Sequence, residues 1–345
     1  MKKWLLILSR IEIVLIFLVI IAGSVVRMSG SGMGCPDWPK CFGHLIPPTE
    51  RSQLDWKANS HFNKKQIIIK DEALYYAVED FTSGSEYNPE NWAKYTRHDY
   101  ALFNPTHTWI EYGNRLIGAL SGLPMLLMFV LSLGLIRQNW WYTVLSGAGL
   151  FMLGFEAWLG KLVVDGNLIP GSITIHMIGA LLIVAILLVF NSLLERENDE
   201  ASAYTSKFKM WSILALILSL VQIGLGTQVR ETIDSLQQSG IARGEWMNNM
   251  DLIFYIHRSF SILILALNLW LWQQNRKLQL GYWQWNAVLV VLILEILVGV
   301  ILAYFDMPYF AQPVHLLLGS MLFALQSHAL IKMILNGRRR VIPIN

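Results

Sequence analysis

The sequence predicts an all-α, polytopic membrane protein in which eight transmembrane helices form two tandem four-helix bundles related by a pseudo-two-fold axis. Three observations support this fold class. The 345 residues are 54% hydrophobic and only 15% charged, whereas soluble domains carry about 25% charged residues. Eight apolar runs are each long enough to cross a bilayer. Several features of the first half recur in the second half in the same order.

The eight expected spans follow from the length of the apolar runs, because about 20 residues cross a hydrocarbon core. They cover residues 5–27, 108–136, 141–164, 172–194, 209–229, 250–272, 282–304 and 313–335. The first run resembles a signal peptide in its position. However, its apolar stretch is too long, and no small-residue cleavage site stands out before Arg27. We therefore expect a retained first helix.

The domain organisation follows from the repeat. Residues 1–194 are expected to form the N-terminal half, which includes a long polar and aromatic loop at 28–107. Residues 195–208 form a linker, and residues 209–345 form the C-terminal half. The net charge of +3 is small and does not indicate nucleic-acid binding.

The basic residues of the short loops predict the orientation. Lys2, Arg137, Lys207 and Arg276 all fall on one side if the chain has eight spans. Both termini are therefore expected in the cytoplasm, with the protein in the inner (plasma) membrane and surrounded by membrane lipid. The short loops on the opposite side contain no Lys or Arg.

An internal repeat is visible in the spacing of ionisable residues. His176 and His315 lie 139 residues apart, and so do Glu156 and Glu295. Duplication is the simplest account, and it predicts a shared architectural role for the two glutamates, such as bonding a neighbouring helix. A proton path through the glutamates is the alternative. Two dipeptides also have counterparts in the second half: Val26-Arg27 matches Val229-Arg230, and Asn114-Arg115 matches His257-Arg258.

The C-terminal half carries a candidate haem site. His257 and His315 lie at matched depth near the outer ends of spans six and eight. Two imidazoles on facing helices of a four-helix bundle are a standard means of holding haem iron. Arg258 is placed to pair a propionate. The alternative is that each histidine only bonds a neighbouring helix. His328 lies too far along the span to share this haem.

The N-terminal half differs from this pattern at one position. Asn114 stands where His257 stands in the second half, and a carboxamide is a poorer iron ligand than imidazole. Glu111 lies three residues before Asn114 on the same helix face, and it suits proton transfer. The alternative is that Glu111 pairs Arg115. We expect the reaction in this half. His107 and His98 of the long loop are the candidates for the histidine that is missing at Asn114, and the sequence does not decide between them.

Two cysteines frame the segment CPDWPKC in the first outer loop. An oxidising compartment predicts a Cys35–Cys41 disulfide. A thiol pair that exchanges with a partner is the alternative.

At these residues the chain resembles the haem A synthase family. GSVVRMSGSGMGCPDWPKCFGHLIPP resembles the signature that follows the family's first helix, and WIEYGNRLIGALSGL resembles its second helix. ITIHMIGALLI, IFYIHRSFSIL and VHLLLGSMLF fit the fourth, sixth and eighth helices. The resemblance covers all eight spans in order.

The resemblance implies both an activity and a set of site residues. It implies haem b bound through iron to His257 and His315. It also implies that haem O binds near His176, Asn114 and Arg115, with Glu111 essential. The implied reaction oxidises the C8 methyl of haem O to a formyl group by successive hydroxylations, giving haem A for cytochrome c oxidase. The resemblance also implies that the two cysteines take part in transferring electrons or in handling the substrate.

The resemblance also implies partners, and it leaves alternatives open. Haem O synthase and the assembly machinery of cytochrome oxidase are the expected partners, and a homo-oligomer is left open. Family members commonly have histidine where this chain has Asn114, so the resemblance does not imply bis-histidine ligation of haem O in this chain. A bis-histidine cytochrome b that carries electrons or oxidises quinol is one competing function. A haem-handling assembly factor without catalysis is another.

Overall fold

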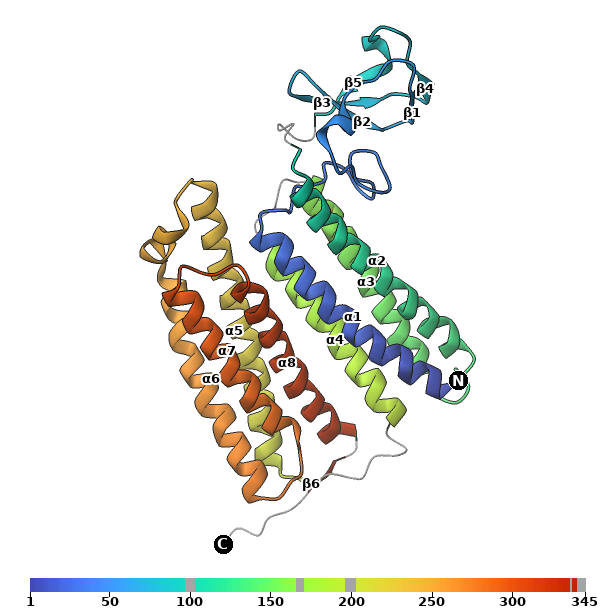
Figure 1. Cartoon of the computed structure of the whole chain (residues 1–345). Helices are drawn as coiled ribbons and strands as arrows, with labels where there is room; N and C mark the ends of the chain where they lie inside the picture. The colour runs from blue at the N-terminus through green and yellow to red at the C-terminus, as the bar shows by residue number, and fades with distance from the viewer. Residues whose placement is uncertain (97–102, 166–170, 196–202, 336, 340–345) are drawn as a thin grey trace. The chain divides into compact units, whose positions relative to one another are not determined.

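The computed structural model describes residues 1–96, 103–165, 171–195, 203–335 and 337–339 (Figure 1). Within these residues, eight helices are long and apolar enough to cross a membrane, which confirms the predicted spans. The chain is therefore a multi-pass membrane protein. The helices are α1 (Lys2–Met28), α2 (Pro105–Leu133), α3 (Trp141–Asp165), α4 (Ser172–Glu195), α5 (Ser206–Gln238), α6 (Leu252–Lys277), α7 (Gln284–Tyr304) and α8 (Ala311–Leu335).

Contacts group the chain into two compact units. The first unit contains residues 1–21, 120–156 and 173–345, and the second contains residues 22–119 and 157–172. The first unit therefore includes α4 to α8 with parts of α1, α2 and α3. The second includes the long segment between α1 and α2.

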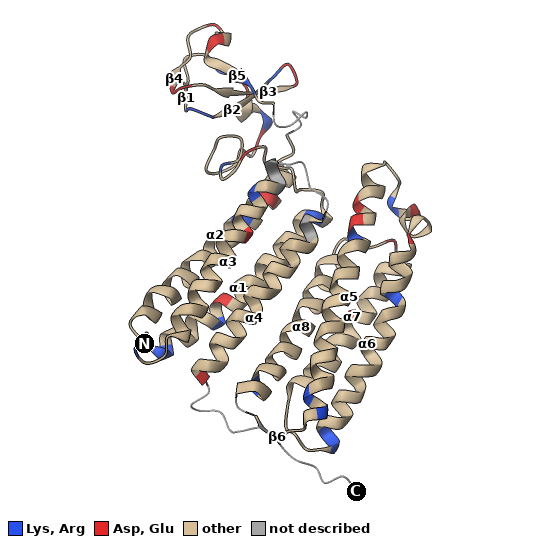
Figure 2. Cartoon of the chain, turned by 180° about the vertical axis from the view of Figure 1, so that it is seen from behind, with Lys and Arg blue, Asp and Glu red and all other residues tan. Residues whose placement is uncertain are grey.

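Helices α5 to α8 form a four-helix bundle inside the first unit. Each helix packs against the next, and α8 closes the ring against α5. Their shared core contains large apolar side chains such as Phe208, Leu271, Trp285 and Met333. The charged residues gather near the ends of these helices and in the connections, while the helix shafts are almost uncharged (Figure 2). This distribution suits lipid around the bundle.

A second apolar core in the first unit draws on the N-terminal helices. It joins Leu5 of α1, Met125 of α2, Tyr142 of α3 and Phe190 of α4. Within the expected linker at 195–208, β6 (Ala203–Tyr204) pairs in parallel with β7 (Arg338–Arg339).

Helix α5 extends nine residues beyond the span expected from the sequence. Arg230 and Asp234 form an ion pair with 2.6 Å between Nη2 and Oδ1, at i and i+4 on the helix. The helix ends before Gly240, which has φ +75°, and the N–H of Ile241 donates to the Leu236 carbonyl at 3.1 Å. The charges therefore end the apolar run but not the helix, and a left-handed glycine stops it. A 3₁₀ helix follows at Arg243–Asn249.

The segment between α1 and α2 contains small β structures. Strands β2 (Ile67–Lys70), β3 (Ala73–Ala77) and β5 (Trp92–Lys94) form an antiparallel sheet in the order β2-β3-β5. Strand β1 (His61–Phe62) pairs with β4 (Phe81–Thr82). Two 3₁₀ helices lie at Arg51–Leu54 and Pro89–Asn91.

Strand β2 has an apolar core on each face. Ile67 and Ile69 pack in the cluster that contains Cys35 and Cys41, while Ile68 packs in the cluster that contains Trp92. Such alternation follows from the two-residue period of a strand. Both faces of this strand are therefore covered.

Candidate functional site

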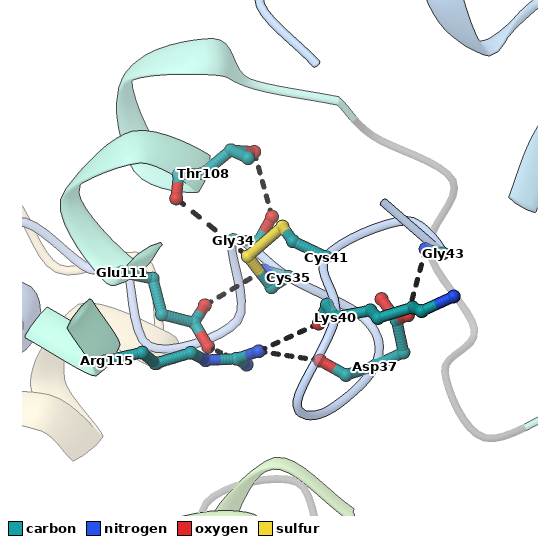
Figure 3. The surroundings of a disulfide bond; sticks show 9 residues. All are labelled: Gly34, Cys35, Asp37, Lys40, Cys41, Gly43, Thr108, Glu111 and Arg115. Atoms are coloured by element: carbon teal, nitrogen blue, oxygen red, sulfur yellow. Dashed lines mark hydrogen bonds and ion pairs between the residues drawn. A yellow bond between two sulfur atoms is a disulfide. The ribbon is translucent and has the colours of Figure 1, made fainter. Parts of the chain in front are cut away.

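The second unit holds a disulfide loop that is tied to α2. Cys35 and Cys41 form a disulfide and are 0% and 1% exposed, so the predicted pairing is confirmed. Glu111 Oε2 accepts a hydrogen bond from the backbone N–H of Cys35 at 2.9 Å (Figure 3). Thr108 Oγ1 donates to the Gly34 carbonyl at 2.8 Å. The first turns of α2 therefore hold the start of the loop.

Arg115 closes the other side of this arrangement. Its guanidinium pairs with the Glu111 carboxylate, and its Nη1 donates to the carbonyls of Asp37 at 2.7 Å and Lys40 at 3.0 Å (Figure 3). The pairing considered as an alternative from the sequence is therefore present. The structure also shows that the same pair clamps the disulfide loop.

Gly34 lets the loop approach α2 closely. A Cβ atom at this position would lie 2.5 Å from the carbonyl oxygen of His107, which is backbone and cannot move aside easily. His107 itself lies seven residues before Asn114, about 10 Å along the helix. His98 lies outside the described residues.

Asp37 and His44 are two titratable groups of the loop whose pKa values are shifted, and both lie outside the helices. Burial raises the pKa of Asp37, while the N–H of Gly43 and the charge of Arg115 act in the opposite direction. Burial lowers the pKa of His44, which lies beside Cys41 in a small antiparallel bridge. The loop therefore disfavours charge on both side chains.

The first unit holds the predicted histidine pair. The rings of His257 and His315 have centroids 6.3 Å apart and planes inclined by 80°. An imidazole nitrogen binds a transition metal at about 2 Å, so two rings on opposite sides of one metal have centres about 6 Å apart. The ring separation therefore fits two axial ligands of one iron.

Each matched histidine lies beside the matched glutamate. His176 Nδ1 lies 2.6 Å from Glu156 Oε2, and His315 Nδ1 lies 3.3 Å from Glu295 Oε1. A carboxylate at the second ring nitrogen fixes the tautomer and orientation of a metal-binding histidine. The sequence predicted a shared role for the glutamates in bonding a neighbouring helix, and the structure identifies the histidines as their neighbours.

Glycines lie beside both histidines of the pair, and one of these glycines has a counterpart beside Asn114. A Cβ at Gly226 of α5 would lie 3.1 Å from Cε1 of His257, and one at Gly299 of α7 would lie 3.3 Å from Cε1 of His315. In the second unit, a Cβ at Gly23 of α1 would lie 3.8 Å from Oδ1 of Asn114. The first and fifth helices therefore each present a glycine, one to Asn114 and the other to His257.

Arg258 differs from its counterpart Arg115. Its guanidinium carbon lies 5.8 Å from the Phe254 ring centroid and 5.4 Å from that of Tyr255. Phe254 stands where Glu111 stands in the first half, so an aromatic ring takes the place of the carboxylate. Arg258 is exposed, and its charge is therefore open to an anionic group.

The site residues are divided between the units. Glu111, Asn114 and Arg115 belong to the second unit, together with both cysteines. The histidines at 176, 257 and 315 belong to the first. The described residues bring together no three His, Cys, Asp or Glu side chains that could hold a bare metal ion. Two axial histidines suffice for haem, because the porphyrin supplies the other iron ligands.

Glu12 of α1 was not among the site residues predicted from the sequence. Its side chain is 0% exposed, and neither carboxylate oxygen has a hydrogen-bond partner among the residues that the structure describes. The sequence could have indicated this residue, because an acidic residue within an apolar membrane span is rare and is a candidate functional residue.

A profile of the cytochrome oxidase assembly protein family (COX15-CtaA) matches residues 3–68 and 86–327. The chain belongs to this family. Membership implies haem involvement. The match leaves out residues 69–85, which carry β3 and β4.

Several curated relatives are similar to the chain, and each is named heme A synthase. The protein of Shewanella oneidensis is 27% identical over 70% of this chain, and the match spans 62% of that protein's length. The protein of Shouchella clausii is 24% identical over 74% of this chain and 72% of its own length. That of Flavobacterium psychrophilum is 21% identical over 92% and 94%, respectively.

Proposed function

We propose that this chain is a haem A synthase that oxidises the C8 methyl of haem O to a formyl group by successive hydroxylations. The product would be haem A for cytochrome c oxidase. Family membership and the similar heme A synthases support this function. The observation that carries this proposal is a contrast between the two halves. The ring of His257 has that of His315 at a centroid distance of 6.3 Å, whereas the position that matches His257 in the first half is Asn114.

In this proposal His257 and His315 hold haem b, with Glu295 orienting His315. Haem b supplies one-electron transfer when bound. Arg258 is available to pair a propionate, since its guanidinium is exposed and stacked rather than committed to a carboxylate. Gly226 and Gly299 leave room beside the two imidazoles.

The substrate site is assigned to the N-terminal half. His176, oriented by Glu156, is the proposed ligand for haem O, and Asn114 and Arg115 are proposed neighbours of the substrate. Glu111 is proposed to move protons, since its Oε2 atom accepts a hydrogen bond in a setting that is 4% exposed. The N-terminal half, the linker and the C-terminal half are proposed to correspond to residues 1–194, 195–208 and 209–345.

Co-expression with a haem O synthase, followed by extraction of the pigments, tests this function. We expect haem A to form with the wild-type chain. If haem O alone accumulates although the chain is folded in the membrane, the proposal is wrong. Haem O synthase and the oxidase assembly machinery are the proposed partners. Both termini of this chain are proposed to be cytoplasmic, and its haem sites are proposed to lie towards the outer side of the membrane.

A bis-histidine cytochrome b that carries electrons is the second candidate, and the His257–His315 pair favours it equally. The two candidates differ in the product. Such a carrier would show a Soret band that His257→Ala removes, yet it would never yield haem A. A haem A synthase would show both the band and the product, and a purified chain with no Soret band would exclude both candidates.

A further inference from the structure

A short apolar surface follows the disulfide loop. Leu45 and Ile46 are 75% and 70% exposed, and Pro47 and Pro48 come directly after them. Single exposed aliphatic side chains are common on proteins, whereas exposed apolar side chains that cluster mark a contact site for a protein or a membrane. We call residues 45–48 the apolar tip.

The backbone on both sides of the two aliphatic residues is held in place. The N–H of Cys41 donates to the His44 carbonyl at 2.9 Å, and the N–H of His44 donates to the Cys41 carbonyl at 3.0 Å. Cys41 is also bound to Cys35 through the disulfide. Pro47 and Pro48 are buried, and their rings fix the backbone φ angle. The exposed side chains therefore project from a braced turn.

A cavity joins the apolar tip to α2. It has a volume of about 530 Å³, and Ile46 and Pro47 line it together with Trp109 of α2. Its lining, within the described part of the chain, includes no Asp, Glu, Lys or Arg side chain. Thr49 and Gln53 also line it, but the N–H of Thr49 donates to Oε1 of Gln53 at 2.9 Å. The cavity therefore suits an apolar ligand.

Trp109 belongs to an exposed apolar face of α2. Leu116, Leu120, Leu123 and Leu127 lie within about 40° of Trp109 around the helix. All five residues are between 39% and 59% exposed. Because α2 is long and apolar enough to cross a membrane, an exposed apolar face along it suits contact with lipid.

The buried residues of α2 lie on its opposite face. Glu111 and Met125 stand about 160° from Trp109 around the helix, and they are 4% and 0% exposed. Glu111 accepts the N–H of Cys35 and does not line the cavity. The cavity beside Trp109 is therefore distinct from the contact between Glu111 and the disulfide loop.

The depth of Trp109 fits the boundary between lipid and water. The 29 residues of α2 span about 43 Å, and a bilayer with its headgroup regions is about 40 to 45 Å thick. Trp109 lies four residues after Pro105, about 6 Å along the helix. The ring of Tyr112 lies 5.7 Å from its ring. Trp and Tyr gather at this depth in membrane proteins.

We propose that the apolar tip enters the lipid leaflet beside the first turns of α2, and that a lipid acyl chain fills the cavity lined by Ile46 and Trp109. Lipid is the occupant because the tip continues the exposed apolar face of α2 at the depth of the membrane interface. Since Leu45 directly follows His44, the membrane contact would also hold the disulfide loop beside α2. This proposal goes beyond haem A synthesis and does not depend on it.

Photocross-linking from lipid tests the contact. The full chain is placed in nanodiscs, one copy per disc, with a phosphatidylcholine that carries a diazirine in the upper part of one acyl chain. After irradiation, the adducts are mapped by mass spectrometry. We expect adducts at Leu45 and Ile46 as well as at Leu116, which is the positive control on α2.

Val78 provides the matched control for an exposed aliphatic side chain in the same segment. It directly follows β3 and is 40% exposed. We expect no adducts above background at Val78, because it is not part of the apolar tip. Labelling of Val78 equal to that of Leu45 and Ile46 would overturn the proposal, and so would the absence of adducts at the tip when Leu116 is labelled.

A charged tip provides a second readout. Ile46→Asp would have to carry its charge into lipid, so adducts at residues 44–48 should fall about tenfold or more relative to those at Leu116. The elution volume in size-exclusion chromatography should stay unchanged. Val78→Asp is the matched variant and should leave the adducts at the tip unaltered. Adducts that persist at the tip of Ile46→Asp would refute the contact with acyl chains.

Other occupants of the same surface would give different results. We expect equal adducts at the tip in nanodiscs that hold one copy and two copies of the chain. Loss of these adducts in two-copy discs would assign the surface to a second copy and overturn the proposal. Loss of the adducts on addition of haem O would instead assign the cavity to the substrate. None of these readouts depends on haem A formation.

Discussion

Nδ1 of His176 lies 2.6 Å from Oε2 of Glu156, so a carboxylate on α3 holds an imidazole on α4. The same two residue types meet between α7 and α8, at 3.3 Å. The equal spacing of 139 residues therefore places a glutamate beside a histidine in both halves. The pair is hydrogen-bonded at His176, whereas Nδ1 of His315 makes no hydrogen bond within the described residues. A carboxylate–imidazole pair at each proposed haem site makes the glutamates testable as orienting groups.

Glu295→Gln should weaken haem b binding without abolishing it. The amide keeps the size of the side chain but loses the negative charge beside His315. Loss of such an orienting partner costs about 10- to 100-fold in metal affinity. Haem titration of the apoprotein measures this affinity. Glu245→Gln, in the 3₁₀ helix after α5, is the control, and an equal affinity in the two variants would refute the role.

Gly226→Ala should disturb the His257 ring. The added Cβ would lie 3.1 Å from Cε1, which is closer than most side-chain contacts, so the ring must shift. We expect a lower haem b content and an altered Soret band in the purified protein. Gly224→Ala is the matched control, because a Cβ there meets no heavy atom within 4 Å among the described residues. Identical spectra for the two variants would contradict this account.

Glu111→Ala should stop haem A formation and leave the haem b spectrum intact. The substitution also removes the acceptor for the Cys35 N–H and the partner of Arg115, so the disulfide loop should loosen. Glu111→Gln can still accept the hydrogen bond. If Glu111→Gln restores the loop, measured by resistance of the disulfide to a phosphine, but not haem A formation, the carboxylate acts in the reaction. Recovery of both would assign Glu111 a structural role alone.

The disulfide loop should become easier to reduce as the pH falls. Burial lowers the pKa of His44, while Asp37 raises it and Lys40 lowers it further. The folded loop therefore binds this proton less readily than the unfolded loop does. The stability that neutral His44 contributes to the loop is lost as the pH falls below about 6.5. The rate of Cys35–Cys41 reduction by a phosphine should rise as the pH is lowered from about 7.5 to about 5.5.

His44→Gln separates this effect from that of Asp37. Burial raises the pKa of Asp37, so protonation of that carboxyl favours the folded loop and opposes the His44 effect. The glutamine variant should lose the acceleration at low pH. An unchanged pH profile in the variant would show that His44 does not control the loop.

The membrane spans could be predicted because a bilayer imposes one length on every apolar helix. The end of α5 could not, since Arg230 and Asp234 pair along the helix and let it continue. The β structure between α1 and α2 could not be predicted either. Ile67, Ile68 and Ile69 are all buried, so strand β2 shows no polar alternation.

The histidine site was partly predictable. Sequence spacing identified Glu156 and Glu295 as equivalent, but spacing alone does not report contact between helices. Glu12 was overlooked because a single acid hardly changes the apolar character of a 27-residue helix. Arg258 was expected to pair with a propionate, but its stacking on Tyr255 depends on side-chain geometry that no motif encodes.

The residues that lie outside the family match also affect the chemistry of the cysteines. Leu74, from the unmatched segment 69–85, packs in the same cluster as Cys35, Cys41 and Ile67. A segment outside the family match thus covers a sulfur–sulfur bond that it does not contain. Loss of the Leu74 side chain would leave that bond more open to solvent reductants, so the rate of thiol chemistry can change through a neighbouring strand while both cysteines stay the same.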